Sequence, residues 1–236
     1  MSTLDFDSFV LAAATDDLSA EPAARNHADA VEFRLDLATD PLDQLAAYDG
    51  DLPLIVTNRA AWEGGEADDE TRRLDTLASA LDHETVAAVD LECGALDGSV
   101  EAAATERVRE LRASAREADI AVIASIHDFE STPSVDELVD LLERASDEGD
   151  VGKLAVTATD RSDALAVLSA THRSVEAGWT VATMAMGAAG QHTRAVAPVY
   201  GSKIGYAPVD PAGATAPGQY DLATLRRLVD GLSTDR

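Results

Sequence analysis

Lysine is nearly absent from this chain. Of its 236 residues eighteen are basic, and only two of these, Lys153 and Lys203, are lysines. Acidic residues number 44, so the formal net charge is −26. A surface this anionic repels phosphate groups, so we expect neither a nucleic-acid partner nor an anionic membrane. Abundant acid with little lysine is typical of proteins in the cytoplasm of a halophile, where salt screens the self-repulsion.

Cysteine, aromatic residues and long apolar runs are scarce as well. The single cysteine, Cys93, cannot form an internal disulfide, and it supports no metal site. No run approaches about 18 consecutive apolar residues, and residues 1–10 contain no basic segment before an apolar one. We therefore expect no membrane span, no signal peptide and no bound metal, and we expect the protein to be cytoplasmic.

Short apolar runs alternate with longer amphipathic segments along the chain. Leu74, Leu77 and Leu81 share one helical face, and Ser134 followed by Glu137 predicts a capping box at a helix start. The expected strands are 9–14, 30–37, 52–59, 87–93, 120–128, 151–158, 180–187 and 203–209. The expected helices lie near 20–28, 41–48, 67–84, 99–118, 134–149, 162–178, 190–200 and 221–233.

This alternation predicts an α/β fold. Eight strand–helix units in about 230 residues are the number needed for a (β/α)8 TIM barrel. We expect one such barrel, a single catalytic domain over residues 1–236. A doubly wound sheet is the alternative on pattern alone, but no glycine-rich phosphate-binding segment follows the first strand.

Several expected strands carry charged side chains on one face. Residues two apart on a strand share a face, so Glu32, Arg34 and Asp36 point the same way. The outer face of a barrel strand packs against helices, so this charged set should point inward. Arg59 and His127 lie near strand ends, where barrel enzymes build their active sites. The alternative is an interior salt-bridge network without chemistry.

Lys153 lies within an apolar run. A buried ammonium is costly unless it is paired or neutralised, and a neutral lysine amine is a nucleophile that forms imines with carbonyl compounds. We predict that Lys153 is a Schiff-base nucleophile and that His127 is its proton-transfer partner. The alternative is a core lysine with a satisfied charge. Lys203 begins the eighth run, at the end of a barrel strand away from chemistry, so we expect it to be structural.

Two loops add candidate residues. The segment WEGGE (62–66) follows Arg59, and its Glu63 could hold the imidazole of His127. The last loop, 209–221, is rich in proline, glycine and alanine, which suits a mobile lid. Gln219 could bind a polar substrate from this loop. The alternative for both loops is an ordinary connection.

Ordered motifs resemble those of type I 3-dehydroquinate dehydratases. They are EFRLD (32–36), TNRAAWEGGE (57–66), SIHDF (125–129), GKLAV (152–156), HTR (192–194), YGS (200–202) and APGQ (216–219). Each motif is weak alone, but seven in the family's order over most of the chain are specific.

The resemblance implies a (β/α)8 barrel that dehydrates 3-dehydroquinate to 3-dehydroshikimate in the shikimate pathway, without a metal or cofactor. It implies that Lys153 forms an imine with the substrate ketone and that His127, oriented by Glu63, moves the proton in a syn elimination. Arg194 would hold the substrate carboxylate. The implied substrate-binding residues are Glu32, Arg34, Arg59, Arg194, Thr215 and Gln219, with Thr215 standing where the family has serine. The family is often dimeric, which leaves a homodimer open.

Two other functions fit parts of the pattern. A class I (Schiff-base) aldolase acting on a sugar phosphate also uses a barrel lysine, but it would need a phosphate-cradling glycine loop after the last two strands. The acidic chain and Arg194 favour a carboxylate instead. A barrel that binds a small carboxylate without turning it over is the third possibility, and Lys153 argues against it, because arginine would supply the charge without a reactive amine.

Overall fold

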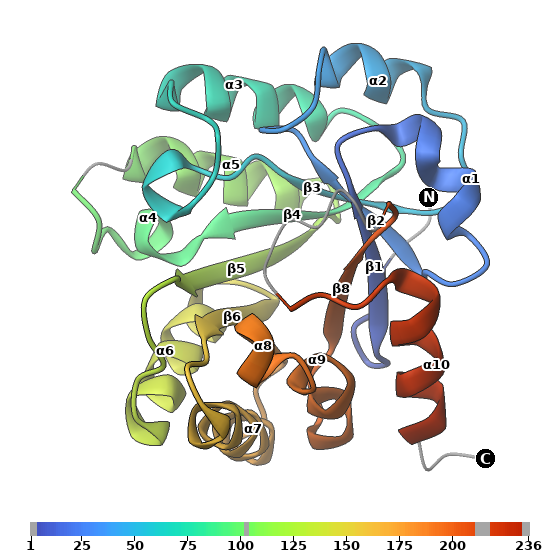
Figure 1. Cartoon of the computed structure of the whole chain (residues 1–236). Coiled ribbons are helices and arrows are strands. Elements are labelled where there is room, and N and C mark those ends of the chain that lie inside the picture. Colours follow the sequence, from blue (N-terminus) through green and yellow to red (C-terminus); the bar gives the residue numbers. More distant parts are fainter. Residues whose placement is uncertain (1–3, 102–103, 211–217, 233–236) are drawn as a thin grey trace.

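Eight parallel strands form the centre of the molecule, and helices surround them (Figure 1). The computed structural model describes residues 4–101, 104–210 and 218–232. The strands are β1 (Val10–Thr15), β2 (Ala30–Arg34), β3 (Leu54–Thr57), β4 (Val86–Glu92), β5 (Ala121–Asp128), β6 (Val151–Thr157), β7 (Val181–Met186) and β8 (Ile204–Pro208). The α-helices are α1 (Glu21–Ala24), α2 (Pro41–Ala47), α3 (Glu70–Ala80), α4 (Cys93–Asp97), α5 (Thr105–Glu117), α6 (Val135–Glu148), α7 (Arg161–Glu176), α8 (Gly187–Gly190), α9 (Thr193–Val196) and α10 (Leu222–Leu232). Short 3-10 helices are η1 (Leu18–Ala20), η2 (Ala61–Glu63) and η3 (Ala197–Tyr200).

The sheet closes almost completely into a barrel. The strand order is β7-β6-β5-β4-β3-β2-β1-β8, so β1 pairs with both β2 and β8. At the remaining seam the Lys203 amide donates to the Val181 carbonyl at 2.8 Å, and the Thr183 amide donates to the Ser202 hydroxyl at 3.0 Å. The predicted (β/α)8 barrel is therefore confirmed.

Alternation along the strands separates an outer from an inner layer. In β2, Val31 and Phe33 are fully buried in the cluster that includes Leu77 of α3. Glu32, between them, lines a cavity inside the barrel. A second cluster fills the barrel itself with mostly aliphatic side chains, among them Ile55 of β3 and Ile123 of β5. The face predicted for the charged residues of β2 is thus the inner one.

The helices differ from expectation in three places. The helix expected near 20–28 forms only over Glu21–Ala24. Cys93 begins α4 instead of ending a strand, and Gly98, with φ of 80°, ends that helix, so the helix expected from residue 99 begins only at Thr105. The helix expected over 190–200 is divided into α8, α9 and η3. Pro198 lacks the amide hydrogen that would continue an α-helix, and the chain tightens there into the 3-10 turn of η3.

Helix α6 follows its prediction closely. The Ser134 side chain accepts from the Glu137 amide, and the Glu137 carboxylate accepts from the Ser134 amide, which completes the expected capping box.

Among the residues that the structure describes, none of the helices is long and apolar enough to cross a membrane.

Candidate active site

A cavity opens where the strands end. The side chains that line it come from six of the strands and from the segments that follow them. Every site residue predicted from the sequence lines this cavity except Thr215, which lies outside the described residues. The lining residues are Glu32, Arg34, Thr57, Arg59, Glu63, Gly64, His127, Phe129, Lys153, Ala155, Met184, Met186, Arg194, Tyr206 and Gln219.

Lys153 projects from β6 into the barrel and is only 4% exposed. Its Nζ donates to Asp90 Oδ2 at 2.8 Å and lies 3.9 Å from Glu32 Oε1. The same atom lies over the ring of Tyr206, 4.3 Å from the ring centre. The amine is therefore held at a fixed place in the cavity by one carboxylate, with a second carboxylate and an aromatic face beside it.

Asp90 links Lys153 to a buried network. Its Oδ1 accepts from Arg59 Nη2 at 2.7 Å and from the Ser125 hydroxyl at 2.6 Å. Burial alone would raise the pKa of Asp90, but Arg59 and Lys153 outweigh it and hold the pKa well below the usual range. Asp90 thus stays a carboxylate and keeps the Lys153 amine in position.

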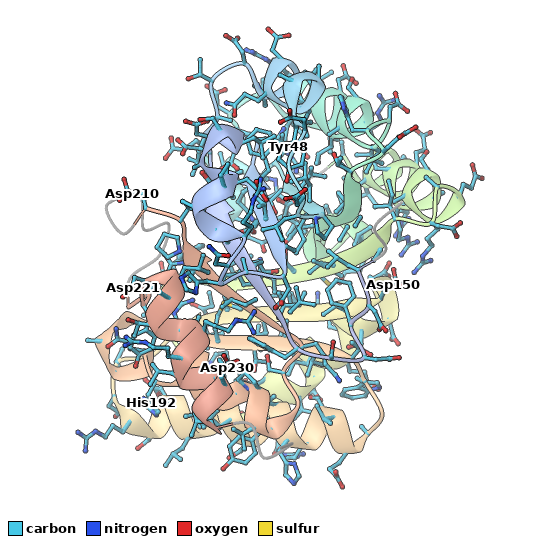
Figure 2. All side chains as sticks on the ribbon, turned by 90° about the vertical axis from the view of Figure 1, so that its right-hand side faces the viewer. Tyr48, Asp150, His192, Asp210, Asp221 and Asp230 are labelled. Atoms are coloured by element: carbon cyan, nitrogen blue, oxygen red, sulfur yellow. The ribbon has the colours of Figure 1, made fainter. Side chains whose placement is uncertain are left out.

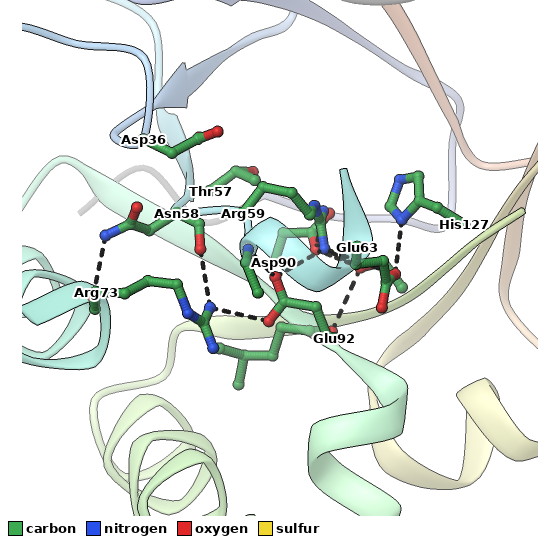
Figure 3. Close-up of polar contacts among 12 residues, drawn as sticks. Asp36, Thr57, Asn58, Arg59, Glu63, Arg73, Asp90, Glu92 and His127 are labelled. Carbon is green, nitrogen blue, oxygen red and sulfur yellow. Dashed lines mark hydrogen bonds and ion pairs between the residues drawn. The ribbon is translucent and has the colours of Figure 1, made fainter. Parts of the chain in front are cut away.

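Glu92 continues this network away from the cavity (Figure 3). Its Oε1 accepts from Arg59 Nη1 at 3.1 Å and from the Ala60 amide at 3.0 Å, and its Oε2 accepts from Arg73 Nη1 at 3.0 Å. Arg73 also pairs with Glu70. These contacts fasten the segment after β3 to β4, and so they fix the start of the loop that carries Glu63.

Glu63 contacts His127, as predicted. His127 Nδ1 lies 2.8 Å from Glu63 Oε1 (Figure 3). Two glycines shape the loop that brings them together: a Cβ on Gly65 would lie 2.0 Å from the Arg59 carbonyl oxygen, and Gly64 has φ of 80°. Other residues at these two positions would displace the turn that aims Glu63.

Burial sets the protonation of the Glu63–His127 pair. Burial raises the pKa of Glu63 to about 8, although Arg59 acts in the opposite direction. Burial, together with Arg59 and Lys153, lowers the pKa of His127 well below its usual value. The imidazole is therefore neutral at pH 7. Above about pH 8 Glu63 is a carboxylate that accepts from Nδ1–H, which leaves Nε2 of His127 free to take a proton.

Among the described residues Arg194 has no acidic partner, unlike Arg34 and Arg59, the other guanidinium groups that line the cavity. It is 4% exposed, and its Nε and Nη2 have no hydrogen-bond partner among the described residues, while Nη1 lies 3.7 Å from Met184 Sδ. Burial lowers the pKa of Arg194 to about 10, so the group remains a cation at pH 7. A carboxylate placed against Nε and Nη2 would satisfy both donors in the bidentate geometry that arginine favours.

The other predicted residues surround these groups. Arg34 makes a bidentate ion pair with Asp36, at 2.9 and 2.6 Å, and Glu32 accepts from the Thr57 hydroxyl at 3.1 Å. Gln219 reaches the mouth because Gly218 packs against the backbone of Gly187 at the end of β7, where a Cβ would lie 2.5 Å from the Gly187 oxygen.

Several residues of the site were missed by the sequence reasoning. Asp90 shares a strand face with Glu92, and that pattern could have placed both carboxylates inside the barrel without showing which of them contacts Lys153. Phe129 follows the histidine strand and stacks on His127 with the ring centres 5.9 Å apart. Tyr206 and Met184 lie in apolar runs that carry no signal of a site. In the described part of the chain, no cluster of three or more histidine, cysteine or acidic side chains is arranged to hold a metal ion.

The fold and the cavity together define a class of protein. It is a (β/α)8-barrel enzyme whose site combines a buried lysine, a neutral imidazole oriented by a carboxyl group, and an arginine free to bind an acid. A lysine in this setting is suited to imine chemistry on a ketone that carries a carboxylate.

The chain belongs to the type I 3-dehydroquinase family, whose sequence model matches residues 10–235. It is 60% identical to the 3-dehydroquinate dehydratase of Haloarcula marismortui over 232 residues, which cover 98% of this chain and 100% of that protein. It is 53% identical to the 3-dehydroquinate dehydratase of Halobacterium salinarum, over 97% of this chain and 100% of the relative. The crystal structure of 3-dehydroquinate dehydratase from Geobacillus kaustophilus superposes with a TM-score of 0.81 at 25% identity, over 97% of this chain and 93% of that one.

The activity is therefore the dehydration of 3-dehydroquinate, a hydro-lyase reaction of the shikimate pathway. The substrate is 3-dehydroquinate. The relatives at 52–60% identity come from halophilic archaea, as the excess of acid and the scarcity of lysine predicted.

Proposed function

We propose that this dehydration proceeds through an imine between Lys153 Nζ and the ketone of 3-dehydroquinate. The observation that carries the proposal is the buried amine itself, held 2.8 Å from Asp90 inside the cavity. The Lys153 ammonium is not suited to be a simple anion-binding site, because Asp90 already neutralises its charge. The imine nitrogen is an electron sink, which stabilises the carbanion formed when the neighbouring carbon loses a proton.

His127 is proposed as the base for that proton. With Glu63 accepting from Nδ1–H, Nε2 takes the proton from the carbon beside the imine and later gives it to the departing hydroxyl. Proton and hydroxyl then leave from the same side of the ring, a syn elimination. Imine hydrolysis finally returns Lys153 to its free state and releases 3-dehydroshikimate.

Arg194 is proposed to hold the substrate carboxylate. Its two unpartnered donors, Nε and Nη2, match the two carboxylate oxygens. A ring fixed at its carboxylate and attached at its ketone presents one face to His127, which removes the orientational cost of proton abstraction.

The remaining residues are proposed to bind the substrate's hydroxyl groups and to complete the cavity wall. Glu32, Arg34 and Gln219 line the same cavity as Lys153. Thr215 is proposed to add a hydroxyl from the last loop. The Nη groups of Arg59 donate to Asp90, Glu92 and Ser125. We therefore propose that Arg59 acts mainly by positioning Asp90.

Turnover of 3-dehydroquinate, followed by the absorbance of the conjugated enone product, tests the assignment of Lys153. We expect Lys153→Met to lose at least about 10⁴-fold in kcat, since no other amine lies in the described cavity. Binding of a cyclohexane carboxylate that lacks the ketone should persist, because Arg194 is intact. A Lys153→Met enzyme that keeps its turnover within ten-fold would remove the imine from the mechanism.

We also propose that the enzyme is a homodimer, joined through α7 and η3. Leu165 is 62% exposed, Val199 54% and Tyr200 41%, which makes this face apolar. Tyr200 stacks edge-on with His172 of α7, so the two elements form one surface, which we call the α7–η3 face.

Charge supports a second copy of the chain as the partner on the α7–η3 face. Residues 164–209 are about a fifth of the chain but contain only one of its 44 acidic residues, Glu176. Exposed carboxylates outside this segment include Asp150, Asp221 and Asp230, which are labelled in Figure 2. Each chain has a net charge of −26, so two copies repel each other least through a surface with few acidic residues. The α7–η3 face is therefore suited to the symmetric contact of a dimer.

Sedimentation velocity at fixed high salt tests the proposed dimer. Leu165→Glu places a carboxylate at the centre of the α7–η3 face, and we expect it to shift the protein from dimer to monomer. Leu42→Glu is the matched control, because Leu42 is 36% exposed on α2, away from this face. A wild-type protein that sediments as a monomer, or a Leu165→Glu variant that stays dimeric, contradicts the proposal.

We propose, further, that residues 1–236 act as one catalytic domain in the cytoplasm. The acid-rich composition suits a cytoplasm with high salt, and the one cysteine suits a reducing compartment. Activity that follows the soluble fraction of the source cells would support this location, and activity in the membrane or secreted fraction would contradict it.

A further inference from the structure

Tyr206 has a buried hydroxyl that no described residue binds. The side chain extends from β8 into the barrel, is 4% exposed and lines the cavity. Its ring belongs to the apolar cluster inside the barrel, but its Oη has no hydrogen-bond partner within residues 4–101, 104–210 and 218–232. Tyr48 shows the ordinary arrangement for comparison, since its hydroxyl donates to the Leu52 carbonyl at 2.8 Å.

An unsatisfied hydroxyl at this place has a cost. Leaving a buried hydrogen-bonding group without a partner destabilises a protein, because the group has lost its hydrogen bonds to water. Phenylalanine would pack the same apolar cluster without this cost. The hydroxyl of Tyr206 therefore points to a ligand atom in the cavity as its partner.

The neighbouring groups make this hydroxyl a donor. Burial, followed by the negative charges of Glu32 and Asp90, raises the pKa of Tyr206 well above its usual value. The group therefore keeps its proton at neutral pH and can donate a hydrogen bond to a ligand oxygen.

The place of Lys153 shows which oxygen that is. Nζ lies over the Tyr206 ring, 4.3 Å from its centre. A phenolic oxygen lies about 2.8 Å from its ring centre, so Oη is roughly 5 Å from Nζ. When Nζ adds to a ketone, the oxygen of the resulting carbinolamine lies about 2.4 Å from Nζ, within reach of a hydrogen bond of about 2.8 Å from Oη.

We propose that the Tyr206 hydroxyl donates a hydrogen bond to the carbinolamine oxygen and assists its loss as water during imine formation. This inference rests on the proposed imine at Lys153. In the first step the Lys153 ammonium gives one proton to the Glu63–His127 pair, the Nζ–C bond forms, the carbonyl π electrons move to the oxygen, and a second proton from Nζ neutralises that oxygen. In the second step the nitrogen lone pair forms the C=N bond, the C–O bond breaks, and the oxygen leaves as water with a proton from the Glu63–His127 pair. Tyr206 keeps its own proton throughout and stabilises the negative charge that develops on the oxygen.

Tyr206→Phe tests the inference, because it removes the hydroxyl and keeps the ring beneath Nζ. We expect the variant to fold with an unchanged or higher free energy of unfolding. Enzyme mixed with 3-dehydroquinate is quenched with borohydride at increasing times, and mass spectrometry follows the adduct at Lys153. The rate of adduct formation should fall about 10- to 100-fold, as for the loss of one donor to a developing oxyanion. Affinity for a cyclohexane carboxylate with a hydroxyl in place of the ketone should not change.

Tyr48→Phe is the matched control, since it removes a partly buried tyrosine hydroxyl away from the cavity. It should lower stability and leave adduct formation at the wild-type rate. Wild-type adduct formation in Tyr206→Phe would overturn the role of the hydroxyl while leaving the imine mechanism intact. A parallel loss of affinity for the hydroxyl analogue would also overturn it, because Tyr206 would then act in binding. Absence of any Lys153 adduct in the wild-type enzyme would instead overturn the proposed mechanism itself.

Discussion

Replacing Arg194 by methionine should make the protein more stable and a much poorer enzyme. Arg194 is a buried cation whose Nε and Nη2 lack partners among the described residues. Methionine is of similar length and suits the neighbouring Met184. The variant removes a buried charge that destabilises the folded protein but binds the substrate. Stability should therefore rise while substrate binding weakens.

The size of the stability change follows from the pKa. Burial lowers the pKa of Arg194 from 12.5 to about 10, which corresponds to roughly 3 kcal/mol at 1.36 kcal/mol per pKa unit. Because the folded-state pKa lies below the unfolded value, the fold disfavours the protonated form. The penalty is therefore present in full below about pH 10 and fades as the pH rises toward 12.5. At pH 7 we expect Arg194→Met to raise the free energy of unfolding by up to about 3 kcal/mol.

The loss in binding should be at least as large. Each hydrogen bond to a charged partner is worth about 1.5–3 kcal/mol, so two of them predict an increase in KM of at least about 100-fold. Guanidinium unfolding at pH 7 and constant salt measures the first effect, and the enone assay measures the second.

Arg73→Met is the control for the stability of Arg194→Met. Arg73 is buried like Arg194, but it is paired with Glu70 and Glu92. Its removal leaves Glu92 without one of its cations, and we expect a loss of about 3–5 kcal/mol. If Arg194→Met is less stable than the wild type, or if its KM stays within a few-fold, the assignment of Arg194 as an unpaired carboxylate binder is refuted.

Three further predictions concern the Glu63–His127 pair, the glycine at position 65 and the surface charge. Glu63→Gln removes the group that titrates at about pH 8. The rise of kcat/KM with pH should therefore move to lower pH, where His127 titrates, and kcat should fall about 10- to 100-fold. An unchanged pH profile would contradict this. Gly65→Ala puts a Cβ 2.0 Å from the Arg59 carbonyl oxygen and should destabilise the protein and lower kcat. The control is Gly231→Ala, whose Cβ would have no atom within 4 Å and which should stabilise α10 by up to about 1 kcal/mol. Equal effects of the two variants in thermal unfolding would rule out the close contact at Gly65. The net charge of −26 predicts that the free energy of unfolding rises steeply with salt, and full stability in dilute buffer would count against it.

The barrel and much of its site could be predicted from the sequence because both follow from local periodicity. Alternation along β2 put Glu32 and Arg34 on one face, and strand ends put His127 and Arg59 near the mouth. In a barrel all strand ends meet, so residues far apart in sequence come together without any further information. The contact of Glu63 with His127 followed from the same reasoning, since the loop after β3 is short and rich in glycine.

Other features depend on how side chains turn within the barrel, which periodicity does not describe. Asp90 and Glu92 share one face of β4, but only the rotation of the barrel decides that Asp90 meets Lys153 while Glu92 meets Arg73. The missing partner of Arg194 is likewise a property of the packed site. The helix expected over 190–200 is wrong because an average apolar pattern does not register local breaks, of which the one at Pro198 follows from the missing amide hydrogen.

The most direct test of the account is to treat the enzyme with 3-dehydroquinate and borohydride and to locate the reduced adduct by peptide mass spectrometry. The account predicts one ligand per chain, attached at Lys153 Nζ. An adduct on Lys203 or at the N-terminus, or active enzyme that is never trapped, would contradict it.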